Sequence, residues 1–184
     1  MKEIRWHGRG GQGSFTAARL LGLSASLFEN KHALAFPSFG PERRGAPVLG
    51  FTKIDDNKIH DRSEPKYCDY IVVLDDTLMN DSVIAGLKPE GKIILNTSNP
   101  KKFTHLNKID ITTVDATSLA ISILGRPITN TAMIGTLAAV SGIVKIESVI
   151  EAIKAEMDDS LVPSNIRIVE ESYRLIKESC LEVL

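Results

Sequence analysis

The sequence predicts an α/β fold, in which helices flank a mostly parallel sheet that carries an added antiparallel hairpin. Strand-like and helix-like segments alternate over most of the chain, as they do where crossover helices join parallel strands. The run Tyr70–Leu74 is continuously apolar, which is typical of a strand buried on both faces. A glycine-rich turn directly follows the first strand-like segment. The 184 residues suit a single domain, residues 1–184.

Hydrophobic periodicity predicts the elements in order. Glu3–His7 is a short strand, and Ser14–Asn30 has dense apolar residues at helical spacing. The stretch Pro37–Pro47 holds three prolines and two glycines, which excludes regular structure. Val48–Ile54 and Lys58–Asp61 then predict a hairpin. The other predicted strands are Ala33–Phe36, Tyr70–Leu74, Lys92–Leu95 and Ile111–Val114, and the other predicted helices are Thr77–Leu87, Ala116–Leu124, Thr131–Val144, Glu147–Met157 and a last helix from Pro163 to the end.

The composition predicts a soluble chain that binds neither nucleic acid nor membrane. Hydrophobic residues make up 43% and charged residues 24%, and the net charge is −1, so no broad attraction to polyanions is expected. The most apolar stretch, Ile134–Val144, is too short to span a bilayer, and the amino terminus does not resemble a signal peptide. Cys68 and Cys180 match no metal-ligand spacing. We expect free thiols and a cytoplasmic location.

A glycine-rich loop is the densest local signal. The run His7–Gly13 follows the first strand and opens the first helix, with the spacing G-x-G-x-x-G. Such a loop lets a phosphate approach unpaired amides at a helix amino terminus, so a Rossmann-like sheet is expected. The same glycines would equally permit close packing of helix on strand, and spacing does not separate the two interpretations. The candidate cofactor-binding residues here are Gly8, Gly10, Gly11, Gln12 and Gly13.

One interpretation of this loop is a stand-alone nucleotide-binding reductase. A nicotinamide site needs an acidic residue at the end of the second strand to hold the ribose hydroxyls. That strand is expected to end at Phe36 and Pro37, while Glu29 falls on the preceding helix. Gln12 also places a polar amide where many dinucleotide loops keep small or apolar residues. The reductase therefore stays as an alternative.

The proline-rich loop after the second strand carries two adjacent arginines. Arg43 and Arg44 could fork onto a phosphate or carboxylate, and they complete the set of candidate ligand residues. Loops that follow parallel strands lie at the same edge of a sheet, which is the usual ligand edge. Most surface arginines bind no ligand, so interface salt bridges or solvation are the competing interpretation.

Three segments taken together resemble a known family. The runs His7–Gly13, Gly40–Val48 and Thr129–Gly135 resemble the gamma subunit of the pyruvate and 2-ketoisovalerate:ferredoxin oxidoreductases. The resemblance extends from Ile4 to about Ile176. The combined pattern is specific to that family, whereas a glycine loop alone occurs in many unrelated proteins.

The resemblance implies an accessory subunit of a heteromeric enzyme. That enzyme converts a 2-oxoacid, coenzyme A and oxidised ferredoxin into acyl-CoA, carbon dioxide and reduced ferredoxin. Alpha, beta and delta subunits and ferredoxin are the implied partners, and thiamine diphosphate, magnesium and iron–sulfur clusters belong to other subunits. Two lone cysteines cannot hold a four-cysteine cluster, and no thiamine-type Gly-Asp-Gly…Asn stretch is present. We expect no catalytic residue, metal or cofactor on the isolated chain, which would lie near the coenzyme A entrance. A purely structural subunit is the remaining alternative.

Two adjacent aspartates follow the buried strand. Asp75 and Asp76 could bind a divalent cation with Asp81. A helix cap formed by Asp76 or Thr77 is the favoured interpretation, because such residues commonly begin helices.

Two further polar residues border the predicted loops and helices. His7 adjoins the glycine loop, and a hydrogen-bonded structural role is favoured over ligand contact. Asn130 is expected to cap the helix that starts at Thr131.

Overall fold

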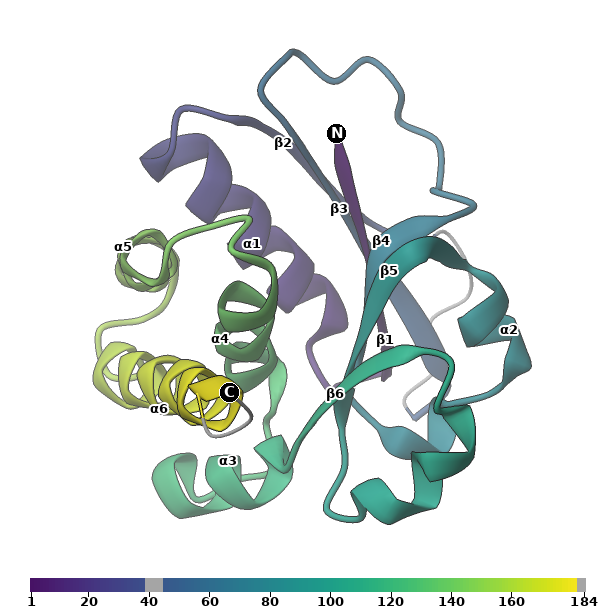
Figure 1. Cartoon of the computed structure of the whole chain (residues 1–184). Helices are drawn as coiled ribbons and strands as arrows, with labels where there is room; N and C mark the ends of the chain where they lie inside the picture. Colours follow the sequence, from purple (N-terminus) through teal and green to yellow (C-terminus); the bar gives the residue numbers. More distant parts are fainter. Residues whose placement is uncertain (39–44, 182–184) are drawn as a thin grey trace.

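The computed structural model describes residues 1–38 and 45–181, and within them six strands form one mixed sheet (Figure 1). The sheet order is β2-β3-β1-β4-β5-β6. The run β1-β4-β5-β6 is parallel, and β3 lies antiparallel between β1 and β2. The strands are β1 (Lys2–Arg9), β2 (His32–Pro37), β3 (Pro47–Asp55), β4 (Cys68–Val73), β5 (Leu87–Asn96) and β6 (Asp110–Val114). The predicted α/β class is confirmed.

The helices cover the two faces of the sheet unequally, as Figure 1 shows. Five lie on one face: α1 (Ser14–Phe28), α3 (Ala116–Leu124), α4 (Asn130–Ser141), α5 (Ile146–Glu156) and α6 (Val162–Leu181). The opposite face carries α2 (Asp81–Ala85) and the short 3-10 helices η1 (Asp76–Leu78) and η2 (Pro100–Leu106). Among the described helices, none combines the length and apolar character that a membrane span requires.

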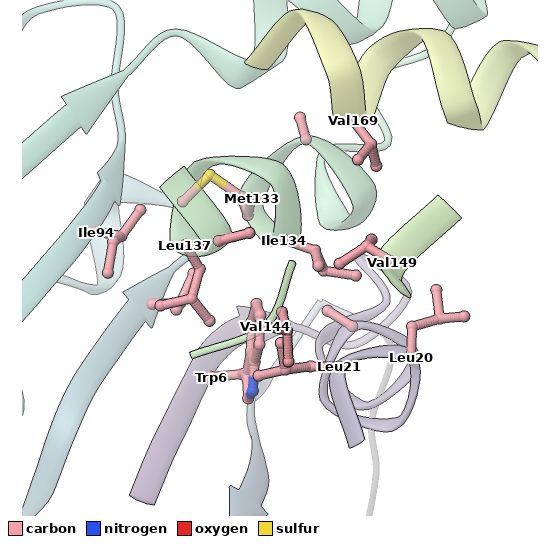
Figure 2. Packing of buried hydrophobic residues seen from close by; sticks show 14 of the residues in the cluster. Trp6, Leu20, Leu21, Ile94, Met133, Ile134, Leu137, Val144, Val149 and Val169 are labelled. Carbon is pink, nitrogen blue, oxygen red and sulfur yellow. The ribbon is translucent and has the colours of Figure 1, made fainter. Parts of the chain in front are cut away.

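The larger core lies between the sheet and the five-helix layer (Figure 2). Trp6, Leu20 and Met133 are fully buried there, and the Trp6 Nε1–H donates to Thr52 Oγ1 over 3.1 Å. Side chains alternate across a strand, so the neighbours of Trp6 point to the opposite face. That alternation places His7 on the side of the sheet that carries α2.

The helix α4 crosses α6 at very close range. A Cβ atom at Gly135 would lie 2.4 Å from the Val169 carbonyl oxygen and 2.3 Å from Ser172 Oγ. The Thr131 hydroxyl of α4 also donates to Asn165 Oδ1 of α6 over 2.9 Å. Glycine is required at the crossing because any side chain would push the two backbones apart.

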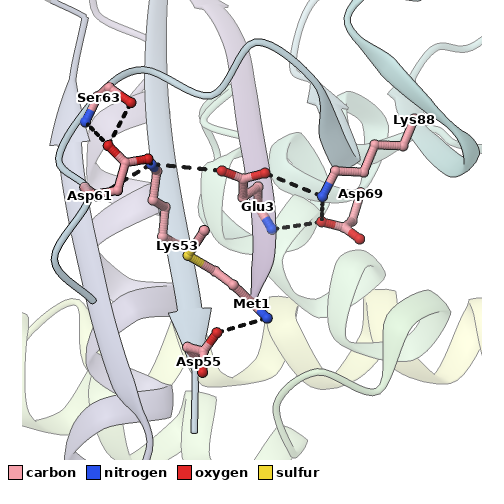
Figure 3. A network of polar contacts seen from close by, with 8 residues as sticks. All are labelled: Met1, Glu3, Lys53, Asp55, Asp61, Ser63, Asp69 and Lys88. Carbon is pink, nitrogen blue, oxygen red and sulfur yellow. Dashed lines mark hydrogen bonds and ion pairs between the residues drawn. The ribbon is translucent and has the colours of Figure 1, made fainter. Parts of the chain in front are cut away.

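The predicted hairpin between Val48–Ile54 and Lys58–Asp61 is wrong. Both edges of β3 are already occupied by β1 and β2, so residues 58–61 cannot pair with β3. A side-chain contact holds this segment instead (Figure 3): Lys53 Nζ lies 2.7 Å from Asp61 Oδ2 and 3.7 Å from Glu3 Oε1. The antiparallel addition to the sheet is therefore β3 itself, paired with β2.

The predicted helix Thr77–Leu87 is also wrong in extent. Asn80 has an extended backbone between η1 and α2, and its Oδ1 accepts hydrogen bonds from Ser82 N and Val83 N. A side chain that caps a new helix start ends the preceding one. The strand β5 then begins at Leu87, earlier than the predicted Lys92–Leu95.

Candidate functional site

Two loops meet at the carboxyl edge of the parallel strands. The first joins β1 to α1, and the second joins β2 to β3. Gly10 N donates to Ala46 O over 2.8 Å, and Gly45 N donates to Gly10 O over 3.2 Å. The prediction that both loops share one edge is confirmed. Arg43 and Arg44 lie outside the described residues, and their ligand role stays a prediction.

The Gln12 side chain forms a hydrogen bond within the glycine loop. Its Oε1 accepts a hydrogen bond from Arg9 N over 2.7 Å, and Gln12 N donates to Arg9 O over 2.9 Å. Gly11 and Gly13 have φ values of 97° and 79°, a region that glycine adopts without strain. A Cβ atom at Gly11 would meet nothing within 4 Å. The backbone at Gly11 is therefore the part of the loop that a ligand can approach.

Two other glycines of the loop permit close packing. A Cβ atom at Gly8 would lie 2.1 Å from Ser14 Oγ, and one at Gly13 would lie 2.6 Å from Asn130 Nδ2. Asn130 is the first residue of α4, and Thr129 occupies the cap position, so the predicted cap is wrong. Asn130 instead packs against Gly13 of the glycine loop, and this contact connects α4 to the candidate site.

Asp75, which follows β4, is hydrogen-bonded to two residues of the glycine loop. Its Oδ2 accepts hydrogen bonds from Arg9 Nε over 2.9 Å and from Gln12 Nε2 over 3.2 Å, and its Oδ1 accepts one from Thr77 N over 3.0 Å. Burial raises the pKa of Asp75, but hydrogen bonds from the Thr77 hydroxyl, the Thr77 amide, Gln12 and Arg9, in that order of effect, hold that pKa below its ordinary value. Asp75 is thus the cap of η1, and the predicted caps Asp76 and Thr77 are wrong by one and two positions.

A polar crevice of about 470 Å³ lies beside Gln12 at the ends of β4, β5 and β6. Three carboxylates line it, from Asp75, Asp76 and Asp115, and Lys102 Nζ lies 3.9 Å from Asp76 Oδ2. Arg9 Nε also pairs with Asp75 over 2.9 Å, so the lining carries only a small net negative charge, which does not favour phosphate groups. The described residues contain no group of three or more His, Cys, Asp or Glu side chains that could hold a metal ion, so the cation site predicted as an alternative has no support.

A cavity of about 380 Å³ lies against α2 on the other side of Gly8, and the described residues that line it include no Asp, Glu, Lys or Arg. His7 Nε2 is buried at this cavity and has no hydrogen-bond partner among the described residues. Burial and then the nearby charge of Arg5 lower the pKa of His7 to about 3, so the imidazole is neutral at pH 7. The sequence favoured a structural hydrogen bond for His7, but Nε2 makes none with the described residues. Other residues that line the cavity are Leu49, Leu78, Asn80, Ser82 and Val83.

These features define a class of protein: an α/β protein in which two hydrogen-bonded loops meet at the carboxyl edge of the parallel strands. The strand β2 ends at Phe36 and Pro37 without the acid that nicotinamide enzymes place there. The chain belongs to the pyruvate ferredoxin/flavodoxin oxidoreductase family, whose family model matches residues 3–175.

Named relatives agree with this assignment over nearly the whole chain. The common gamma subunit of the pyruvate/ketoisovalerate oxidoreductases of Pyrococcus furiosus is 47% identical over 179 residues, which cover 94% of this chain and 96% of that protein. Pyruvate synthase subunit PorC of Methanothermobacter marburgensis is 45% identical over 180 residues, which cover 97% and 99% of the two chains.

Solved structures agree with the fold. The pyruvate oxidoreductase subunit PORC of Thermotoga maritima has a TM-score of 0.80 at 35% identity, with 94% of this chain and 95% of that chain covered. A 2-oxoglutarate:ferredoxin oxidoreductase of Magnetococcus marinus has a TM-score of 0.74 at 12% identity, with 97% of this chain and 31% of that chain covered. The latter match shows the shared fold alone.

Sequence reasoning missed two residues of the site, Ser14 and Arg9. Ser14 follows the glycine loop directly and is only 2% exposed, and a hydroxyl at a helix start was a signal that could have been used. Arg9 lies inside the glycine run, but nothing in the sequence pairs it with Asp75, which lies 66 residues away. That contact depends on the parallel pairing of β1 with β4.

Proposed function

We propose that this chain is the non-catalytic gamma subunit of a heteromeric 2-oxoacid:ferredoxin oxidoreductase, with pyruvate as the expected 2-oxoacid. The enzyme would oxidatively decarboxylate the 2-oxoacid and transfer the acyl group to coenzyme A, while ferredoxin accepts the electrons. The observation that carries this proposal is the end-to-end match to gamma subunits at 45–48% identity. Alpha, beta and delta subunits, or fused equivalents, are the proposed partners.

The described residues do not fit the redox and thiamine cofactors of such an enzyme. Cys68 is buried, and burial raises the pKa of its thiol to about 11, which disfavours the thiolate that a cluster needs. The described residues also offer no metal-binding group of three side chains. We therefore place thiamine diphosphate, magnesium and the iron–sulfur clusters on the partner subunits.

We propose that coenzyme A contacts this chain at the edge where the two loops meet. Gly11 and Gly45 both have positive φ values and open space beside them, so their backbones are accessible. The amides at the start of α1 favour an anion. The acidic crevice on the Gln12 side disfavours phosphate, so the phosphates would approach from the side of Gly11 and Gly45. Arg43 and Arg44 directly precede Gly45 in the sequence and could supply the positive charge.

The arginine proposal is tested with Arg43→Lys and Arg44→Lys in the assembled enzyme. Lysine keeps the charge but loses the planar fork that grips phosphate. A raised KM for coenzyme A, with the KM for the 2-oxoacid unchanged, would support ligand contact, and loss of assembly would indicate an interface role. Arg62→Lys, at an exposed position in the segment after β3, is the matched control. If all three variants behave alike, the arginines are solvated surface.

A stand-alone nucleotide-binding reductase remains the alternative function. It requires the ribose-binding acid that β2 lacks at its end. Titration of the isolated chain with NAD and with coenzyme A separates the two proposals, because the reductase would bind NAD tightly and the gamma subunit would not.

A further inference from the structure

The edge strand β2 leaves one side of its backbone unpaired. It is the first strand in the sheet order, so only β3 pairs with it. Ser38 N donates to Leu49 O over 3.0 Å, and the β2–β3 register, continued by one residue, places these two directly opposite each other. In an antiparallel pair, residues bonded to the neighbouring strand alternate with residues whose backbone groups point away from it. Ala33, Ala35 and Pro37 therefore direct their backbone groups to the free edge of the sheet.

This free edge offers the N–H groups of just two residues, Ala33 and Ala35. Pro37 has no N–H, and proline is usual at an outward position of an edge strand for that reason. The preceding outward position is Lys31, whose N–H already donates to Ala25 O over 3.2 Å. Within residues 1–38 and 45–181, no strand lies beyond β2 to receive the other two donors. They are placed symmetrically about the residue between them, Leu34.

The strand β2 has little protection against pairing with another chain. Edge strands commonly carry charged side chains, bulges or prolines that prevent such pairing. The run His32–Pro37 contains no Lys, Arg, Asp or Glu, and its register with β3 is continuous. Pro37 blocks pairing only at the end of the strand. The opposite edge strand, β6, begins instead with a charged residue, Asp110.

We propose that β2 pairs with β2 of a second copy of this chain, in antiparallel orientation about a two-fold axis at Leu34. In this register Ala33 lies opposite Ala35 of the second copy, and the two residues exchange N–H···O=C hydrogen bonds. The symmetry repeats this exchange, so every free N–H of both edges is used. A second copy therefore supplies the matching spacing of donors and acceptors by symmetry, as a closed homodimer requires.

The side chains suit the same register. Leu34, which is half-buried, faces Leu34 of the second copy in a pair without mutual hydrogen bonds, where side chains approach most closely. Phe36, whose ring centroid lies 5.4 Å from that of Phe51, comes opposite His32 of the second copy. On the other face, a Cβ atom at Gly22 of α1 would lie 3.4 Å from Ala35 Cβ, so α1 supports the strand from one side. The interface does not depend on the proposed function.

The first test measures the mass of the full isolated chain by analytical ultracentrifugation over a range of concentrations. We expect a dimer. Ala35→Pro removes one outward N–H per chain without touching the bonds to β3, and it should raise the dimer Kd about tenfold or more. Leu34→Lys places like charges opposite each other and should leave a monomer. Ile121→Lys, at an exposed apolar residue of α3, is the matched control and should stay dimeric. A wild type that is monomeric at every concentration, or unchanged dimerisation of Ala35→Pro, would overturn the proposal.

A second test reads the register from amide hydrogen exchange in the wild-type chain. We expect the amides of Ala33 and Ala35 to be protected in concentrated protein and to exchange faster on dilution. The amides of Leu34 and Phe36, which point toward β3, should stay protected at both concentrations. Rapid exchange at both alanines in concentrated protein would contradict the pairing. Protection that arises only when the chain joins other subunits would assign this edge to one of them, and it too would overturn the pairing with a second copy.

Discussion

The crossing of α4 and α6 gives the sharpest stability prediction. A Cβ atom at Gly135 would lie 2.4 Å from the Val169 carbonyl oxygen and 3.2 Å from its carbonyl carbon. Because these are backbone atoms, no side-chain rotation relieves the clash, and the helices must move apart. Overpacking of this kind costs about 1–3 kcal/mol, against a gain of up to about 1 kcal/mol from replacing glycine within a helix. We expect Gly135→Ala to lower the free energy of unfolding by about 1–2 kcal/mol.

Gly22 of α1 provides the matched control. A Cβ atom there would lie 3.4 Å from Ala35 Cβ and 3.7 Å from Ala33 Cβ, which are ordinary contacts. Gly22→Ala should therefore be neutral or stabilising by up to about 1 kcal/mol. Urea unfolding of the isolated chain, with the midpoint and the slope fitted separately, measures both variants. Equal effects of the two substitutions, or stabilisation by Gly135→Ala, would refute the close crossing.

Three further predictions concern charge, thiol chemistry and the glycine loop. The hydrogen bond from Lys53, followed by those from Ser63, lowers the pKa of Asp61. The contribution of the Asp61 carboxylate to stability is therefore fully present above about pH 4 and is lost as the pH falls below that value. The Tm difference between the wild type and Asp61→Asn should shrink on acidification, and a constant difference would contradict this pairing. Cys68, whose pKa is raised to about 11, should react with a thiol reagent only after unfolding, and rapid labelling of the native chain at this residue, mapped by mass spectrometry, would be inconsistent with its burial. Gly11→Val forces a branched residue into a positive φ, so we expect it to reduce turnover of the assembled enzyme and also Tm, and wild-type turnover would remove the functional role of this loop.

The sequence predicts the strands that are local and strongly apolar, but not the partners that those strands choose. Tyr70–Leu74 was recognisable from its continuous apolar run and corresponds to most of β4. The pairing of β3 with β1 brings together residues that are far apart in the sequence, such as Lys2 and Ile54. Hydrophobic periodicity describes only neighbouring residues, so it carries no signal for such a contact. A local hairpin with Lys58–Asp61 was therefore the natural, and wrong, expectation.

The candidate site divides in the same way. The glycine loop was visible because its spacing requires only neighbouring residues, and the structure places it beside the second loop as predicted. Its contact with Asp75 and its packing against Asn130 depend on how distant elements meet. The missing hydrogen bond of His7 is likewise a property of three-dimensional packing, because it depends on which groups surround a buried nitrogen. Features that depend on neighbouring residues are thus predictable from the sequence, whereas cavities and buried polar atoms without a hydrogen-bond partner are not.

The central claim is that this chain is an obligatory but non-catalytic subunit. The direct measurement is 2-oxoacid-dependent, coenzyme A-dependent reduction of ferredoxin by the complex purified through an affinity tag on this chain, compared with the isolated chain. We expect the tagged chain to bring down the partner subunits with full activity, and the isolated chain to be colourless and inactive. Purification of the tagged chain without partners from its native source, or 2-oxoacid oxidation by the isolated chain, would contradict the account.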